Sequence, residues 1–204
     1  MDPRAHWESV YHAKAPNAFS WYRPHLDLSL GLIRQAATST SAAILDVGAG
    51  ESTLVDDLLA ARYEDVTLLD ISPTALQVTK ERLGPRAAQV RFLTADVLEA
   101  AFAPGSYDVW HDRAVFHFLT SDWERAAYVR QALSATKPGG HVIVGTFGPQ
   151  GPRKCSGLDV LRYDAVSLHD QFGPRFRLVE SREELHETPS GAIQQFLYCY
   201  CVRE

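Results

Sequence analysis

Short apolar runs alternate with segments of helical spacing along most of the chain. Buried runs of about five to seven residues are typical of strands covered on both faces, and apolar residues three and four apart are typical of helices. This pattern predicts strands at 43–47, 65–71, 89–94, 107–111 and 141–147, with helices at 52–63, 72–83 and 122–136. Strands that alternate with helices predict a mostly parallel sheet covered by helices on both faces.

The two ends of the chain depart from this alternation. After a helix near 163–172, strands at 176–186 and 193–202 flank a Thr-Pro-Ser-Gly turn, which predicts a hairpin and so an antiparallel last strand. We therefore expect an α/β, Rossmann-like, doubly wound sheet of seven strands with an antiparallel C-terminal strand. Residues 1–40 lack a strand signal but are rich in aromatics, so we expect a single domain over 1–204, with an N-terminal helical cap at 1–40 and the body at 41–204.

Composition narrows the possible partners. The net charge is −5 and no run of five Lys or Arg occurs, which argues against a nucleic-acid partner. No apolar stretch reaches the ~18 residues that cross a membrane, and no signal sequence is evident. Three cysteines make no disulfide framework, which favours a reducing, cytoplasmic setting. The eight histidines show no metal-ligand spacing, so we expect no metal, and the oligomeric state stays open.

The turn after the first predicted strand suggests a small-molecule site. In such sheets, ligands bind beyond the carboxyl ends of the strands. The strand ends in Asp46-Val47-Gly48-Ala49-Gly50, where Gly48 and Gly50 permit a tight turn and close approach of a ligand to the backbone. The helix that follows presents free N–H groups there.

Acidic residues end three successive strands. Asp46 precedes the glycines, Asp70 ends the second strand, and Asp96 follows the third, with Ile71 and Val97 beside them. Asp46 would repel a pyrophosphate but favour a sulfonium or ammonium, while Asp70 could accept ribose hydroxyls and Asp96 an adenine amino group. Each acid alone is more often a helix cap, but together they favour S-adenosylmethionine (SAM). A dinucleotide fingerprint would need glycine where Thr53 stands.

These motifs and several longer ones resemble class I SAM-dependent methyltransferases over nearly the whole chain. Within that family the chain is similar to a branch with citrate synthase lysine methyltransferase and uncharacterised bacterial proteins. The shared segments are His6-Trp7-Glu8 with Tyr11, Ser20-Trp21-Tyr22, the run Trp110–Leu119, Gly151–Leu158 and the Lys-Pro-Gly-Gly at 137–140. The resemblance implies SAM as cofactor, S-adenosylhomocysteine (SAH) as product, and a first segment that closes over SAM, with Trp21 in contact. No mitochondrial presequence is evident, so we do not carry over the mitochondrial substrate.

The same resemblance places the acceptor beside the end of the fourth strand. Candidate catalytic residues are His111, which could also contact the cofactor, and Asp112. Candidate substrate contacts are Trp7, Tyr11, Tyr22, Arg113, Phe116 and His117. Structural alternatives are that Asp112 and Arg113 pair to fix the loop, that Phe116 is a core residue, and that the N-terminal aromatics pin the cap to the sheet.

Four functions remain to be compared. The first is methyl transfer to N, S or O of a small molecule, and the second is methylation of a protein lysine. A closed aromatic pocket would favour the first, and an open acidic rim the second. The others are an NAD-dependent oxidoreductase, against which Asp46 and Thr53 count, and a non-catalytic nucleotide-binding protein.

Overall fold

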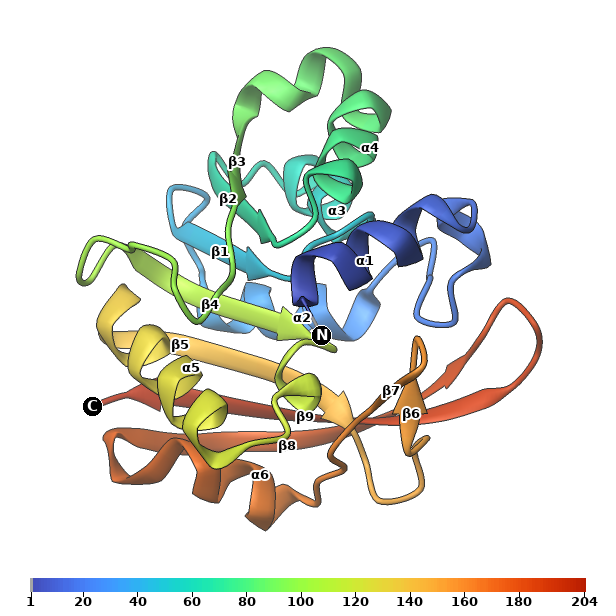
Figure 1. Ribbon diagram of the computed structural model, residues 1–204. Coiled ribbons are helices and arrows are strands. Elements are labelled where there is room, and N and C mark those ends of the chain that lie inside the picture. The colour runs from blue at the N-terminus through green and yellow to red at the C-terminus, as the bar shows by residue number, and fades with distance from the viewer. Residues whose placement is uncertain (1) are drawn as a thin grey trace.

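The computed structural model describes residues 2–204, and its centre is one seven-stranded sheet with the order β3-β2-β1-β4-β5-β9-β8 (Figure 1). Neighbouring strands pair in parallel except β9, which runs antiparallel to both β5 and β8. This confirms the predicted fold class. The strands are β1 (Ala43–Val47), β2 (Asp65–Asp70), β3 (Val90–Thr94), β4 (Tyr107–Arg113), β5 (Thr136–Phe147), β8 (Phe176–Glu187) and β9 (Ile193–Arg203).

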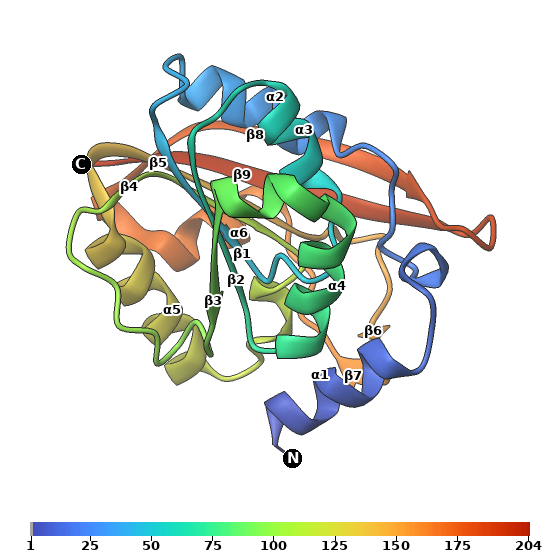
Figure 2. The same ribbon diagram turned by 90° about the horizontal axis from the view of Figure 1, so that it is seen from above.

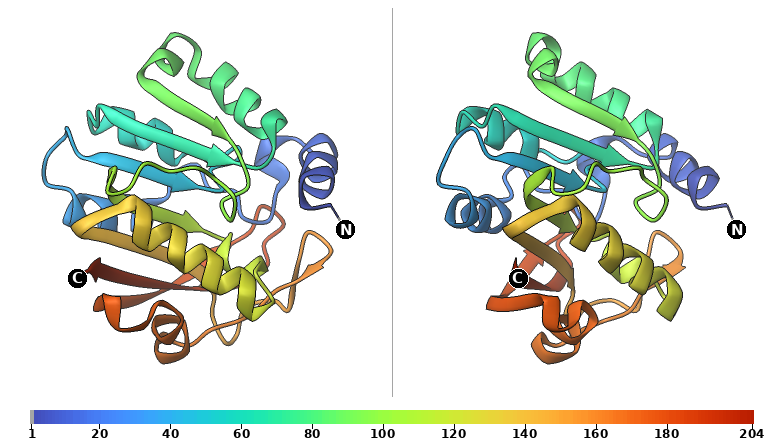
Figure 3. Two further views of the ribbon diagram at one scale, coloured as in Figure 1. Left: turned by 60° about the vertical axis from the view of Figure 1, so that its left-hand side comes forward. Right: turned by 90° about the vertical axis from the view of Figure 1, so that its left-hand side faces the viewer.

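Helices cover both faces of the sheet (Figures 2 and 3). One apolar cluster joins the first face to α2 (Asp27–Ala36), α3 (Leu54–Ala60) and α4 (Pro73–Leu83). A second joins the other face to α5 (Asp122–Ala135) and α6 (Ala165–Phe172). None of the helices in residues 2–204 is long and apolar enough to cross a membrane.

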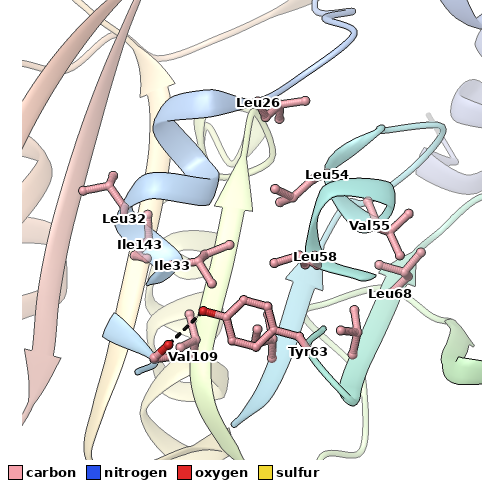
Figure 4. Close-up of a cluster of buried hydrophobic side chains, with 14 of the residues drawn as sticks. Leu26, Leu32, Ile33, Leu54, Val55, Leu58, Tyr63, Leu68, Val109 and Ile143 are labelled. Atoms are coloured by element: carbon pink, nitrogen blue, oxygen red, sulfur yellow. Dashed lines mark hydrogen bonds between the residues drawn. The ribbon is translucent and has the colours of Figure 1, made fainter. Parts of the chain in front are cut away.

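The first cluster fixes the amino-terminal half of the sheet (Figure 4). Ile33 of α2 and Leu58 of α3 are fully buried and point toward Val109 of β4. The Tyr63 hydroxyl donates to the Ala37 carbonyl across 2.8 Å, so its one polar atom is paired inside the apolar layer. This packing holds β1, β2 and β4 side by side, which sets where their carboxyl ends meet.

Local signals located several boundaries correctly. Helix α4 begins at Pro73, and the Ser72 hydroxyl caps it by accepting a hydrogen bond from the Ala75 amide. Helix α5 begins after Ser121, whose side chain and that of Glu124 form a capping box.

Several short elements and some strand bounds differ from the sequence prediction. Strand β5 begins at Thr136 rather than at 141, because Thr136 pairs with Tyr107 and the Lys137 ammonium binds Asp108 at 2.8 Å. Residues 137–140, which were predicted to separate the helix from the next strand, are therefore part of β5. A hairpin of β6 (Lys154–Cys155) and β7 (Leu158–Asp159) was not predicted, nor was the 3₁₀ turn Phe116–Phe118.

The N-terminal region is helical, as predicted, but its parts have different roles. Helix α1 (Pro3–His12) and the 3₁₀ turn Pro16–Ala18 lie outside the layered body, whereas α2 packs on the sheet as one of its covering helices. We therefore use the name cap for residues 2–23. The Glu8 carboxylate fastens α1 to the start of α4 by accepting from the Thr74 hydroxyl at 2.7 Å and from the Ser72 hydroxyl.

Candidate active site

A cavity of about 460 Å³ lies beyond the carboxyl ends of β1, β2 and β4. That volume is in the range of small-ligand sites. The cap and the β6–β7 hairpin contribute to its walls through Trp7, Trp21 and Leu158. Of the residues predicted from the sequence, those that line the cavity are Trp7, Tyr11, Trp21, Tyr22, Asp46, Gly48, Ala49, Asp70, Ile71, Asp96, Val97, His111 and Arg113.

The glycine turn after β1 is shaped by close contacts on two sides. Gly48 and Gly50 both have positive φ, at 64° and 49°. A Cβ on Gly48 would lie 2.0 Å from Val115 Cγ2, and one on Gly50 would lie 2.3 Å from the Tyr11 hydroxyl. Both positions therefore require glycine for backbone conformation and for space. Gly50 itself does not line the cavity, but its lack of a side chain leaves room for the hydroxyl of Tyr11 in the cap.

Asp70 is a buried carboxyl at the end of β2. It accepts hydrogen bonds from the Gly50 amide and the Ser72 amide, each at 2.8 Å. Burial raises the pKa of Asp70 to about 7, against the lowering effect of these two amides, and the nearby Asp46 raises it further. A carboxylate at this position has free lone pairs for hydroxyl donors.

Asp46 and His111 form a buried pair where β1 and β4 end. The two residues are direct partners in the parallel register, and the His111 Nδ1 lies 2.7 Å from the Asp46 Oδ1. Nδ1 therefore carries the hydrogen, and Nε2 becomes an acceptor. The imidazole is 1% exposed, and its Nε2 has no partner among the described residues. A buried acceptor without a partner at a cavity wall is an available site for a donor from a ligand.

Aromatic rings from the cap form the opposite wall. Trp7 meets Phe118 edge-on with ring centroids 4.9 Å apart, and Trp21 stacks on Phe19 at 4.7 Å. Tyr11 packs against both Phe19 and Trp21. The electron-rich faces of such rings attract sulfonium and ammonium groups.

Besides Gly50, three predicted residues do not line the cavity, and the predictions for them are corrected. Asp112 is fully buried on the opposite face of β4, where its carboxylate accepts from the Val115 and Phe116 amides and from the Tyr128 hydroxyl. Burial raises the pKa of Asp112 to about 6, although these donors favour its charged form. It holds the loop after β4, so it is not a catalytic candidate. It does not pair with Arg113 either, because Arg113 binds Glu184 and Tyr198.

Phe116 and His117 are parts of the interior. Phe116 is fully buried against Tyr128 of α5 and Phe172 of α6, which confirms the core alternative. The His117 Nδ1 accepts from the Phe147 amide at 3.2 Å. Burial lowers the pKa of His117 to about 3, with a smaller contribution from Arg113, so its ring is neutral. Neither residue lines the cavity.

Glu51 is a cavity residue that the sequence reasoning missed. It is 5% exposed, its Oε2 has no hydrogen-bond partner among the described residues, and burial raises its pKa to about 7. The available signal was its position directly after the glycine turn, three residues before α3 begins at Leu54. His6, from the shared segment His6-Trp7-Glu8, and Glu124 also line the cavity, although no contact was predicted for either.

Comparison with known proteins agrees with this geometry. Residues 44–140 match the family model described as "Methyltransferase domain". A mouse "eEF1A lysine and N-terminal methyltransferase" is 28% identical over 119 residues, 58% of this chain. The match spans only 17% of that relative's length.

Residues 44–140 thus match a methyltransferase domain, and the comparisons support the class I SAM-dependent family. Two solved structures share the fold of the chain. A structure titled for conversion of a disulfide bond into a thioacetal group during echinomycin biosynthesis superposes with a TM-score of 0.77, at 20% identity, and covers 97% of this chain and 91% of its own. The Burkholderia thailandensis 1,6-didemethyltoxoflavin-N1-methyltransferase, with 1,6-didemethyltoxoflavin and SAH bound, gives 0.70 at 19% identity, covering 98% of this chain and 86% of its own.

The cofactor of the domain is SAM, and the cavity residues fit it. The glycine turn offers backbone without side chains, the Asp46–His111 pair offers an unpartnered acceptor, and Asp70 offers oxygens for hydroxyl donors. Asp46, Asp70 and Glu51 together favour a ligand with positive charge. Asp96 and Val97, at the start of the loop after β3, also line the cavity, and we propose that they lie on its adenine side.

We predict that Gly50→Ala weakens SAH binding at least about tenfold, because the new methyl group displaces the Tyr11 hydroxyl and strains a backbone with φ of 49°. Isothermal titration calorimetry measures the affinity. Gly31→Ala is the matched control, since nothing lies within 4 Å of a Cβ there and alanine favours the α2 helix. Equal SAH affinity in the Gly50→Ala variant would contradict the role given to this turn.

We predict that SAH binds more tightly as the pH rises through the Asp70 pKa of about 7, because the ionised carboxylate is the stronger acceptor for ribose hydroxyls. From about pH 6 to about pH 8 the ionised fraction rises from about a tenth to about nine tenths, so Kd falls up to about ninefold. Asp70→Asn should bind weakly at every pH. Glu51→Gln should keep the pH dependence; if this variant lost it instead, Glu51 would be the group responsible.

Proposed function

We propose that this chain transfers the methyl group of SAM to a small-molecule acceptor held against the aromatic wall of the cavity. The observation that carries the proposal is the continuity of that wall: Trp7 meets both Trp21 and Phe118 edge-on, and all three side chains line the cavity. A continuous aromatic surface suits a compact acceptor, which is oriented by ring contacts. The small-molecule methyltransferase that shares the fold is consistent with this.

The residues at the strand ends have a limited chemical task. Bound SAM supplies an electrophilic methyl group on a sulfonium, so what the protein adds is mainly alignment of the nucleophile. His111 Nε2 accepts the proton that an acceptor N–H, S–H or O–H loses. Asp46 holds Nδ1–H of the same ring and stabilises the imidazolium that forms. Trp21 and Trp7 exclude water from the acceptor side.

Methylation of a protein lysine is the second candidate. The observation in its favour is the similarity to the eEF1A lysine and N-terminal methyltransferases. The shared region is 119 residues long, less than two thirds of this chain. The acidic residues of the cavity, Asp46, Asp70 and Glu51, would suit a cationic acceptor, whether it is a small molecule or a lysine side chain.

The two candidates are separated by incubating the protein with extract and SAM that carries a tritiated methyl group. We expect label in the small-molecule fraction, because the continuous aromatic wall suits a compact acceptor. The Asp70→Ala variant, which should not bind SAM, sets the background. Label confined to the protein fraction would replace the first candidate with the second.

We predict that His111→Asn lowers kcat by about 100-fold, the usual contribution of a general base. The asparagine amide nitrogen can occupy the place of Nδ1 and keep the bond to Asp46, while the acceptor atom at Nε2 is lost. The rate is measured with the acceptor that the labelling identifies, and SAH affinity by calorimetry. A fall in SAH affinity as large as the fall in kcat would show that His111 binds cofactor instead of acting as a base.

A further inference from the structure

The C-terminal hairpin extends beyond the sheet that it belongs to. The last pair between β5 and β9 is Phe147 with Phe196, whereas β8 and β9 stay paired as far as Glu187 with Ile193 (Figure 1). We use the name projecting hairpin for residues 184–195. None of these residues lines the cavity, yet they contact both segments that form its outer walls.

The first of these segments is the cap. The Glu184 Oε1 lies 2.5 Å from the Arg23 Nη1, and His186 Nε2 lies 2.6 Å from the Ser20 carbonyl oxygen. A carbonyl only accepts, so His186 carries its hydrogen on Nε2. Burial lowers the pKa of His186, and the nearby Arg113 and Arg23 lower it further, so the ring is neutral. These two bonds fix the backbone on both sides of Trp21.

Arg113 connects the same cluster to the cavity wall. Its Nη1 donates to the Trp21 carbonyl at 3.1 Å, and its Nε donates to the Tyr198 hydroxyl at 2.9 Å. Its Nη2 lies 3.6 Å from the Glu184 Oε2, and its guanidinium lies 4.2 Å above the Phe196 ring. One carboxylate thus faces two guanidiniums, both of which line the cavity. Removing its charge leaves two cations close together with no anion between them.

The second segment is the loop from β5 to β6. The Gln195 Oε1 accepts from the Gln150 amide at 2.7 Å, and its carbonyl accepts from the Gly148 amide at 2.9 Å. A Cβ on Gly148 would lie 2.6 Å from that Gln195 oxygen, so the loop lies directly on the hairpin. The loop leads into β6 and β7, where Cys155 and Leu158 line the cavity.

We propose that Glu184 is a positioning residue for methyl transfer. It acts through Arg23 and Arg113 to hold Trp21 against the cavity, and it touches neither cofactor nor acceptor. His186 supports the same segment through Ser20. The inference rests on the proposed function, because it takes the Trp21 wall to be where cofactor and acceptor meet. The projecting hairpin thereby sets the shape of a site to which it contributes no lining residue.

The test compares Glu184→Gln with Glu187→Gln, a control with the same change of charge at an exposed position of β8. Hydrogen exchange followed by mass spectrometry reports the cap directly and needs no acceptor. In Glu184→Gln we expect amides 19–26 to exchange at least about tenfold faster, while amides of β4 and β9 keep their rates. SAH affinity should fall about tenfold, and Glu187→Gln should match the wild type in both measurements.

Arg23→Gln breaks the same contact from the cap side and separates positioning from a general loss of stability. It should reproduce the exchange and affinity changes, and the double variant should be little worse than either single one, since both remove one shared interaction. Unchanged exchange at 19–26 in Glu184→Gln, or faster exchange throughout the sheet, would overturn the inference. Absence of SAH binding by the wild type would instead overturn the proposed function, whatever the exchange data show.

Discussion

Parallel pairing of β1 with β4 at the centre of the sheet is the constraint on which the site depends. From β1 the chain continues outward to β2 and β3, and only then returns to β4 on the other side of β1. Connections therefore leave β1 and β4 in opposite directions, which opens a crevice between them. The register places Asp46 directly beside His111, so the buried pair is a consequence of strand alignment. A shift of one residue in this pairing would place the two side chains on opposite faces of the sheet.

Burial of several acids at one cavity has an energetic consequence. Asp70 and Glu51 both have pKa values raised to about 7, mainly by desolvation; Asp46 raises the pKa of Asp70 further, and Asp70 raises that of Glu51. The protein without ligand therefore holds carboxyl groups that are costly to ionise. A ligand that brings a positive charge and hydroxyl donors offsets that cost on binding. The acidic residues by which the site was predicted therefore also favour a cofactor that carries positive charge.

The structure shows which parts of the site could be predicted from the sequence. The glycine turn, Asp46 and Asp70 depend on one strand end each, so a local pattern was enough to find them. Beyond His111 the prediction failed because side chains alternate along a strand: His111 and Arg113 face the cavity, while Asp112 faces α5. Ala114, with φ of 74°, then turns the chain so that Phe116 enters the core. Residue type alone indicates neither that Asp112 faces α5 nor that Phe116 enters the core.

The contacts that shape the acceptor wall are of another kind. Glu184 meets Arg23 across 161 positions of the chain, and His186 meets Ser20 across 166. No local pattern encodes such a contact, since it depends on where the last two strands place their projecting end. Two proteins of 20% identity or less share this fold. In the proposed arrangement the short turns of the sheet hold the cofactor, and distant segments that pack together shape the acceptor side, so the acceptor side can change in sequence while the sheet is retained.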